Sequence, residues 1–188
     1  MFILTLQDVD PVTIFQPLKR ATHFTRFEFE FKNKSVGTVH ECSYKQIASK
    51  QVLVLHAVVH EKVFQMHALF SISKCNEYYV DCINVISYEI CELCSKLQLL
   101  THFIVFKNTK ETLTTCPIVG EYRYKNMTIE ADKFGSIFSI PTEKWWEYYW
   151  KINVILYDTQ KAEFASTNLD FHFIQYRSRN RKHQKNIT

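Results

Sequence analysis

The sequence predicts a mainly β fold, a two-sheet β-sandwich or β-cup with one short helix at about residues 87–99. Hydrophobic and polar side chains alternate along most of the chain, which is the pattern of half-buried strands, and one segment has helical spacing instead. The chain has 188 residues, a length that fits one domain, and 46% of them are hydrophobic, as in globular proteins. Its three glycines, Gly37, Gly120 and Gly135, lie far apart. Nucleotide-binding folds that need a glycine-rich phosphate loop are therefore excluded.

The N-terminal half contains three predicted strands. Residues 23–32 (HFTRFEFEFK) place Phe27, Phe29 and Phe31 on one face and charged side chains on the other. Residues 50–60 (KQVLVLHAVVH) are apolar on both faces, as expected of a central strand or a cavity wall. A third alternating row consists of Phe64, Met66, Ala68, Phe70 and Ile72.

The predicted helix begins at Ser87, a residue type that favours the N-cap position. Apolar residues then recur every three to four positions, which places them on one helical face. These residues are Ile90, Leu93, Cys94 and Leu97. The helix is expected to end near Leu99.

The C-terminal third predicts two short strands, at residues 120–128 and 136–140, and then a long hairpin. Residues 158–161 (DTQK) have the composition of a turn. The strand before this turn alternates through Trp146, Tyr148, Trp150, Ile152, Val154 and Leu156, and the strand after it through Leu169, Phe171 and Phe173.

Charge and composition divide the chain into three parts. Residues 23–175 form the predicted single β domain, and residues 1–22 an N-terminal segment that we interpret as the remnant of a longer start. Residues 176–188 form a basic tail, which holds Arg177, Arg179, Arg181, Lys182 and Lys185 and no acidic residue. Nucleic-acid binding is not expected, because the basic residues lie in a tail and not across a folded face. A solvated tail and a membrane-docking tail both fit this charge.

The sequence predicts neither an enzyme nor a metal or cofactor site. His56 and His60 have the spacing of a zinc pair, but on a strand they would lie about 13 Å apart. Cys91 and Cys94 form a CxxC motif without the strand–helix context of redox proteins or a second close cysteine pair. No serine or cysteine lies in a nucleophile motif. A cytosolic thiol or zinc protein built around Cys91 and Cys94 stays open as a third alternative.

Two further features indicate an exported protein with an aromatic surface. Six cysteines form an even number that suits disulfides, and glycosylation sequons begin at Asn33, Asn126 and Asn186. Trp145 and Tyr149, in the segment WWEYYW, either belong to core and surface or line the rim of an opening for an apolar ligand.

The order of the cysteine segments resembles a known family. Residues 75–82 (CNEYYVDC) precede the predicted helix with its two cysteines, and residues 116–122 (CPIVGEY) and the hairpin follow. This order resembles the ganglioside-activator branch of the ML lipid-recognition domains, and more closely its divergent secreted insect relatives, some of them linked to chemosensation. The resemblance covers about residues 42–175. It implies a β-cup that holds acyl chains, braced by disulfides.

The resemblance also implies disulfide pairs. It pairs Cys75 with Cys82 and Cys91 with Cys116, and it leaves Cys42 and Cys94 as the third pair. The sequence departs from the family at Ala165, where a cysteine is usual. Trp145 and Trp146 also stand where the family has a glycine.

The leading hypothesis is a secreted, non-enzymatic carrier of a lipid or other apolar small molecule, which replaces water around an apolar tail. A membrane surface or a receptor is a further expected partner. The predicted cup residues are Phe27, Phe29, Phe31, Phe64, Met66, Phe70, Ile152, Val154, Phe171 and Phe173, with Trp145 and Tyr149 at the rim. The alternative is an extracellular β-sandwich interaction module with a solid core, in which the same residues only fill the interior.

Overall fold

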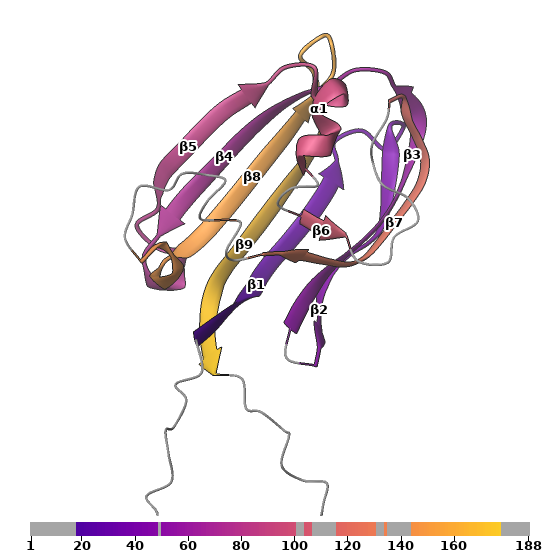
Figure 1. Cartoon of the computed structure of the whole chain (residues 1–188). Coiled ribbons are helices and arrows are strands. Elements are labelled where there is room, and N and C mark those ends of the chain that lie inside the picture. The colour runs from indigo at the N-terminus through magenta and orange to yellow at the C-terminus, as the bar shows by residue number, and fades with distance from the viewer. Residues whose placement is uncertain are drawn as a thin grey trace, which may run out of the picture.

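The computed structural model describes residues 18–48, 50–100, 104–106, 116–130, 134 and 144–177. These residues form two antiparallel sheets that face each other (Figure 1). The strands are β1 (Leu18–Phe31), β2 (Gly37–Ile47), β3 (Lys50–Val63), β4 (His67–Cys75), β5 (Ile83–Ile90), β6 (Ile104–Phe106), β7 (Ile118–Ile129), β8 (Tyr149–Tyr157) and β9 (Glu163–Arg177). The helical elements are α1 (Leu93–Leu100) and the 3-10 turns η1 (Glu77–Tyr79) and η2 (Trp145–Glu147). The predicted fold class is confirmed.

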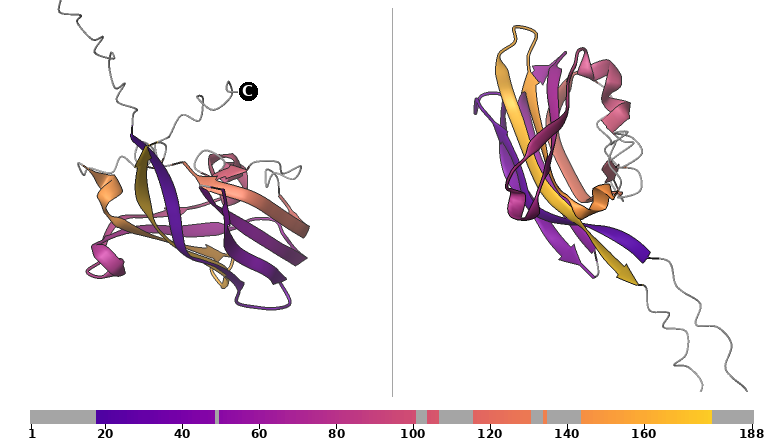
Figure 2. Two further views of the ribbon diagram at one scale, coloured as in Figure 1. Left: turned by 90° about the horizontal axis from the view of Figure 1, so that it is seen from below. Right: turned by 90° about the vertical axis from the view of Figure 1, so that its left-hand side faces the viewer.

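The larger sheet has the strand order β1-β9-β8-β4-β5, and the smaller sheet the order β2-β3-β7-β6. The two outermost described positions, Leu18 and Arg177, pair with each other. β1 and β9 therefore begin and end at the same extremity of the sandwich (Figure 2). In the predicted hairpin, β8 pairs with β9. The turn between them is stabilised by Asp158, whose Oδ1 accepts hydrogen bonds from the amides of Gln160 and Ala162.

The predicted helix boundary is wrong. Residues 87–90 belong to β5, and Ser87 pairs with Ser71 of β4. The α-helix begins only at Leu93, whose amide donates to the Met66 carbonyl (2.8 Å). The helical spacing that begins at Ile90 continues through Leu93, but pairing with β4 satisfies the backbone hydrogen bonds of residues 83–90. The predicted strand at 136–140 lies outside the described residues.

An aromatic core fills one end of the sandwich. The ring centroid of Phe134 lies 5.2 Å from that of Trp150 and 5.3 Å from that of Phe171. The ring centroids of Trp145 and Phe173 are 4.8 Å apart. The indole nitrogen of Trp150 donates to the Trp145 carbonyl (3.0 Å), so this buried ring has its polar atom satisfied. Such edge-to-face contacts add to the stabilisation from burial alone. Phe134 and aromatic side chains of η2, β8 and β9 therefore pack together at this end of the sandwich.

Candidate ligand-binding cavity

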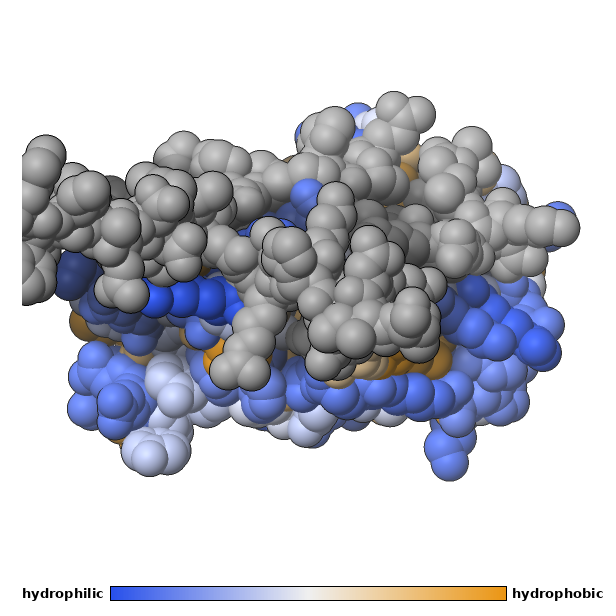
Figure 3. All heavy atoms as spheres, turned by 60° about the horizontal axis from the view of Figure 1, so that its bottom comes forward, coloured by the Kyte–Doolittle hydropathy of each residue, from blue (hydrophilic) through white to orange (hydrophobic). Residues whose placement is uncertain are grey.

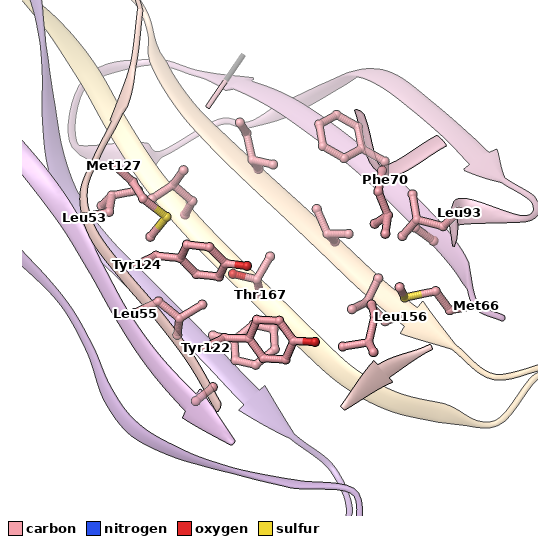
Figure 4. Close-up of a pocket in the computed structure, with 18 of the residues that line it drawn as sticks. Leu53, Leu55, Met66, Phe70, Leu93, Tyr122, Tyr124, Met127, Leu156 and Thr167 are labelled. Carbon is pink, nitrogen blue, oxygen red and sulfur yellow. The ribbon is translucent and has the colours of Figure 1, made fainter. Parts of the chain in front are cut away.

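A cavity of about 290 Å³ lies between the two sheets (Figure 4). Both sheets and α1 contribute to its wall. The residues of the larger sheet that line it are Phe27, Phe29, Phe31, Ala68, Phe70, Ile90, Ile152, Val154, Leu156, Phe164, Thr167 and Leu169. The other lining residues are Leu53, Leu55, Ala57, Val59, Val63, Met66, Leu93, Leu97, Ile118, Tyr122, Tyr124, Met127, Ile129 and Phe134.

Strand periodicity positions these side chains. On β3, alternate residues from Leu53 to Val59 point inward, and on β8 the inward residues are Ile152, Val154 and Leu156. The register Phe27↔Leu169 and Phe29↔Thr167 aligns the inward face of β1 with that of β9. The cavity therefore follows from the alternation of polar and apolar residues along the strands.

The cavity wall carries no charged side chain among the described residues that line it. Its polar atoms are the hydroxyl groups of Tyr122, Tyr124 and Thr167. Thr167 Oγ1 donates to the Glu28 carbonyl (2.8 Å), and the Tyr122 hydroxyl donates to the Val119 carbonyl (3.3 Å). The Thr167 and Tyr122 hydroxyls thus have partners within the protein. The wall can surround hydrocarbon, but it offers no ion pair to a charged group.

The charges of β1 lie on its outer face instead. A side-chain hydrogen bond from Arg26 lowers the pKa of the Glu28 carboxyl, and one from Lys32 lowers that of Glu30. Both carboxylates are ionised near neutral pH and paired at the surface. They contribute no acid–base chemistry to the cavity.

Helix α1 contributes Leu93 and Leu97 to the cavity wall. Leu93 and Leu97 are almost fully buried and pack against Val59, Met66 and Ile118. None of the helices in the described part of the chain has the length and hydrophobicity that a membrane span requires. In the space-filling view, hydrophobic surface is visible next to a hydrophilic margin (Figure 3).

The structure places most of the predicted cup residues at the cavity. Phe27, Phe29, Phe31, Met66, Phe70, Ile152 and Val154 line it. Phe64 does not, and its side chain is 70% exposed, because β3 ends at Val63 and β4 begins only at His67. Phe171 and Phe173 do not line it either, since they lie on the inner face of β9 within the aromatic core. Ligand binding by these residues stays a prediction.

The predicted rim pair is not brought together. Trp145 lies in η2 and packs inward against Phe173 and Phe134. Tyr149 lies on the outer face of β8, where it contacts Tyr79 and His172. The strand begins only after η2, so the two aromatic residues lie on opposite faces of the larger sheet.

The predicted cup residues include none of the smaller sheet or of α1, although residues 50–60 were expected to form a central strand or a cavity wall. Tyr122, Tyr124 and Met127 of β7 line the cavity together with Leu53 and Leu55 of β3 (Figure 4). The signal for β3 was present in its two apolar faces. For β7, the alternation of Tyr122 and Tyr124 with charged neighbours gave the equivalent signal.

The disulfides agree with the prediction at one bridge and correct it at another. Cys75 is bonded to Cys82, as predicted. Cys116 is bonded to Cys94 and not to Cys91, so the predicted pairs Cys91–Cys116 and Cys42–Cys94 are both wrong. The reason is the strand β5, which carries Cys91 to the sheet surface, whereas Cys94 lies in α1 at the margin of its packed face.

The two remaining cysteines are free in the structure. The Cys42 thiol is half-buried beside the Phe27 carbonyl (3.4 Å), and Cys91 is exposed.

The other sequence candidates have ordinary structural environments. His56 Nε2 contacts Glu121 (2.7 Å), and His60 Nε2 contacts Thr38 (2.9 Å). Asn33 is exposed in the turn after β1, and Asn126 is a partly buried residue of β7, while Asn186 lies outside the described residues. Glycosylation of Asn33 and Asn126 stays a prediction.

No protein-family model and no curated protein matches the sequence. Among solved structures the chain is similar to chicken MD-1, crystallised in complex with lipid IVa. The alignment covers 82% of this chain and 89% of that chain, with 14% sequence identity and a TM-score of 0.33.

Proposed function

We propose that this protein binds a lipid or another apolar small molecule in the cavity between its sheets. The observation that supports the proposal is the cavity itself, about 290 Å³ in volume and free of charged side chains among its described lining residues. A solid sandwich would pack its interior to the density of a crystal, with few voids larger than a water molecule. An apolar void of this size is costly unless a ligand fills it.

The cavity sets the scale of the ligand. Its volume equals about ten times the volume of a water molecule in the liquid. A methylene group transferred from water to such a site gains about 0.8 kcal/mol. We therefore expect one hydrocarbon chain or a compact apolar molecule to be bound by solvation of its tail, with any polar head group outside the cavity.

We further propose that the protein is a secreted carrier. Two disulfides in the described residues support an oxidising compartment, because such bonds rarely persist in the cytosol. Release of the ligand to a membrane or receptor, and a chemosensory role, stay predictions from the family resemblance.

A cavity-filling variant tests the proposal. Ala68 is buried on β4 and lines the cavity, so Ala68→Phe should occupy the space that a ligand needs. We expect the variant to lose at least tenfold in affinity for a fluorescent single-chain fatty acid, which unlabelled fatty acid displaces from the unmodified protein. Its thermal stability should be unchanged or higher, because the ring fills a void.

Two matched variants control the test. Ser71→Phe places the same ring on the outer face of β4 and should keep full affinity. Ala165→Phe places it at a fully buried position outside the cavity, where overpacking should cost about 1–3 kcal/mol. If Ala68→Phe is as destabilising as Ala165→Phe and the unmodified protein binds no probe, the core is solid. The interaction module would then be the better hypothesis.

A further inference from the structure

Three metal-ligating side chains lie close together outside the cavity. They are His67 at the start of β4, Glu89 near the end of β5, and Cys91 just after it. Their possible ligand atoms all lie within 4.8 Å of one another. His67 precedes the inward-facing Ala68 and therefore points to the outer face of the larger sheet.

The register of β4 and β5 creates this cluster. Ala68 pairs with Ile90, and Leu69 pairs with Glu89. When the same antiparallel register is continued by one residue, Cys91 lies opposite His67. Glu89 is then the diagonal neighbour of His67 on the same face. Side chains from two segments more than 20 residues apart in sequence are thus positioned by backbone pairing.

The donor set suits zinc. Zn²⁺ binds thiolate, imidazole and carboxylate ligands, and three protein ligands with an open fourth position are a common arrangement. Tetrahedral coordination requires ligand atoms about 3.5 Å apart. Glu89 and Cys91 are exposed, so rotation of their side chains can bring the ligand atoms to this separation. One thiolate and one carboxylate also balance the charge of a divalent cation.

Two further observations show that side chains of this cluster are available to bind a metal. His67 Nδ1 is buried and has no hydrogen-bond partner in the part of the chain that the structure describes. A buried polar nitrogen without a partner is costly, and a metal bound through it would supply one. Cys91 is exposed and outside both disulfides, so its sulfur is available as a ligand.

We propose that His67, Glu89 and Cys91 form a zinc-binding site on the outer face of the larger sheet, separate from the cavity. The open coordination position is available to water or to a side chain of a partner. Lys96 lies beside the site and donates from its ammonium group to the Cys91 carbonyl (3.0 Å). This neighbouring positive charge opposes cation binding, so we expect moderate affinity.

Metal titration of the full chain, oxidised and stripped of metal with a chelator, tests the site. Calorimetry with Zn²⁺ should show one equivalent bound. Co²⁺ should give the near-ultraviolet thiolate charge-transfer absorption of a cysteine-ligated metal. Cys91→Ser should abolish this absorption, and both Cys91→Ser and His67→Gln should weaken Zn²⁺ binding more than tenfold. Glu89→Gln should weaken it less, because an amide oxygen stays available.

The matched controls are Cys42→Ser and His60→Gln. Cys42 is the other free cysteine, and burial raises the pKa of its thiol to about 11, so it is not expected to bind metal. Both controls should bind Zn²⁺ with unchanged affinity. Zn²⁺ should also protect Cys91 from alkylation by iodoacetamide, a readout that does not depend on calorimetry.

Several results would overturn the proposal. These are the absence of stoichiometric binding, equal binding by Cys91→Ser with a melting curve like that of the unmodified chain, and peptide mapping that finds Cys91 in a disulfide. The fatty-acid assay does not involve these residues, so the zinc site and the cavity proposal can fail independently.

Discussion

At the residue scale, His172 is a pH-sensitive position. Its ring lies on the outer face of β9 between His23 of β1 and Tyr149 of β8, each 4.7 Å away. Burial lowers the pKa of His172, and the neighbouring His23 lowers it further. The Nδ1 atom of His172 is buried and has no hydrogen-bond partner among the described residues. Protonation of the ring therefore places a positive charge there without a hydrogen-bond acceptor.

The sign of the pH effect follows from linkage. The unfolded chain has an ordinary histidine pKa of about 6.5, and the folded chain a lower one, so the unfolded state binds more protons between the two. Stability should therefore fall as the pH drops from 7.5 to 5.5. His172→Gln should make this fall smaller, as measured by Tm at constant ionic strength.

His60→Gln makes the same substitution at an exposed histidine and should keep the full pH dependence. The range from pH 7.5 to 5.5 lies above the ordinary pKa of an aspartate. Burial raises the pKa of Asp170, so this residue makes the fold more stable as the pH falls, which is opposite to the effect of His172. An unchanged pH dependence in His172→Gln would contradict the assignment.

At the element scale, the Cys94–Cys116 bridge ties α1 to the start of β7. The bridge spans 22 residues, and closing a loop of that length stabilises a fold by about 3 kcal/mol. Replacing both cysteines by serine should lower the free energy of unfolding in urea by about this amount. Cys91→Ser, measured without metal, should change it by less than about 0.5 kcal/mol. A large loss of stability in Cys91→Ser would contradict the observed bridge and support the predicted pairing of Cys91 with Cys116.

The strands were predictable where the residue pattern fits strand alternation and does not also fit helical spacing. The alternation of Phe27, Phe29 and Phe31 with charged residues fits a strand alone, and β1 contains them. Residues 87–97 were ambiguous, because Ile90 and Leu93 fit helical spacing while Ile90 also faces inward from β5. Tertiary pairing with β4 decided between the two. The incorrect disulfide pair came from the family resemblance, which paired Cys91 of the expected helix with Cys116, whereas Cys94 forms this bond.

Cys91 was a zinc candidate in the sequence only as part of the CxxC motif with Cys94, and its grouping with His67 and Glu89 had no sequence signal. His67 and Cys91 are neighbours only because β4 and β5 pair in one particular register. No spacing rule applies to ligands that belong to different strands. Such a site can be found only after the pairing is known.

At the scale of the whole molecule, the sandwich has an aromatic core and, next to it, a cavity, and Phe134 belongs to both. Both contain inward-facing aromatic and aliphatic residues, so Phe171 of the core and Phe70 of the cavity look alike in sequence. Whether facing side chains meet depends on the separation of the sheets and on what else enters between them. Here Phe134 enters at one end, and its position in the sequence gave no indication of that role.

The cavity makes the fold sensitive to hydrostatic pressure. A void lined by hydrocarbon excludes water and disappears when the chain unfolds, so the ligand-free protein should lose volume on unfolding. We expect a volume change near the large end of the usual range of about 20–100 mL/mol. Saturation with a fatty acid, or Ala68→Phe, should reduce it, as followed by tryptophan fluorescence at high pressure. Equal values in all three states would contradict the expectation. If the expectation holds, the volume change on unfolding would report how much of the cavity is occupied, even when the occupant is not known.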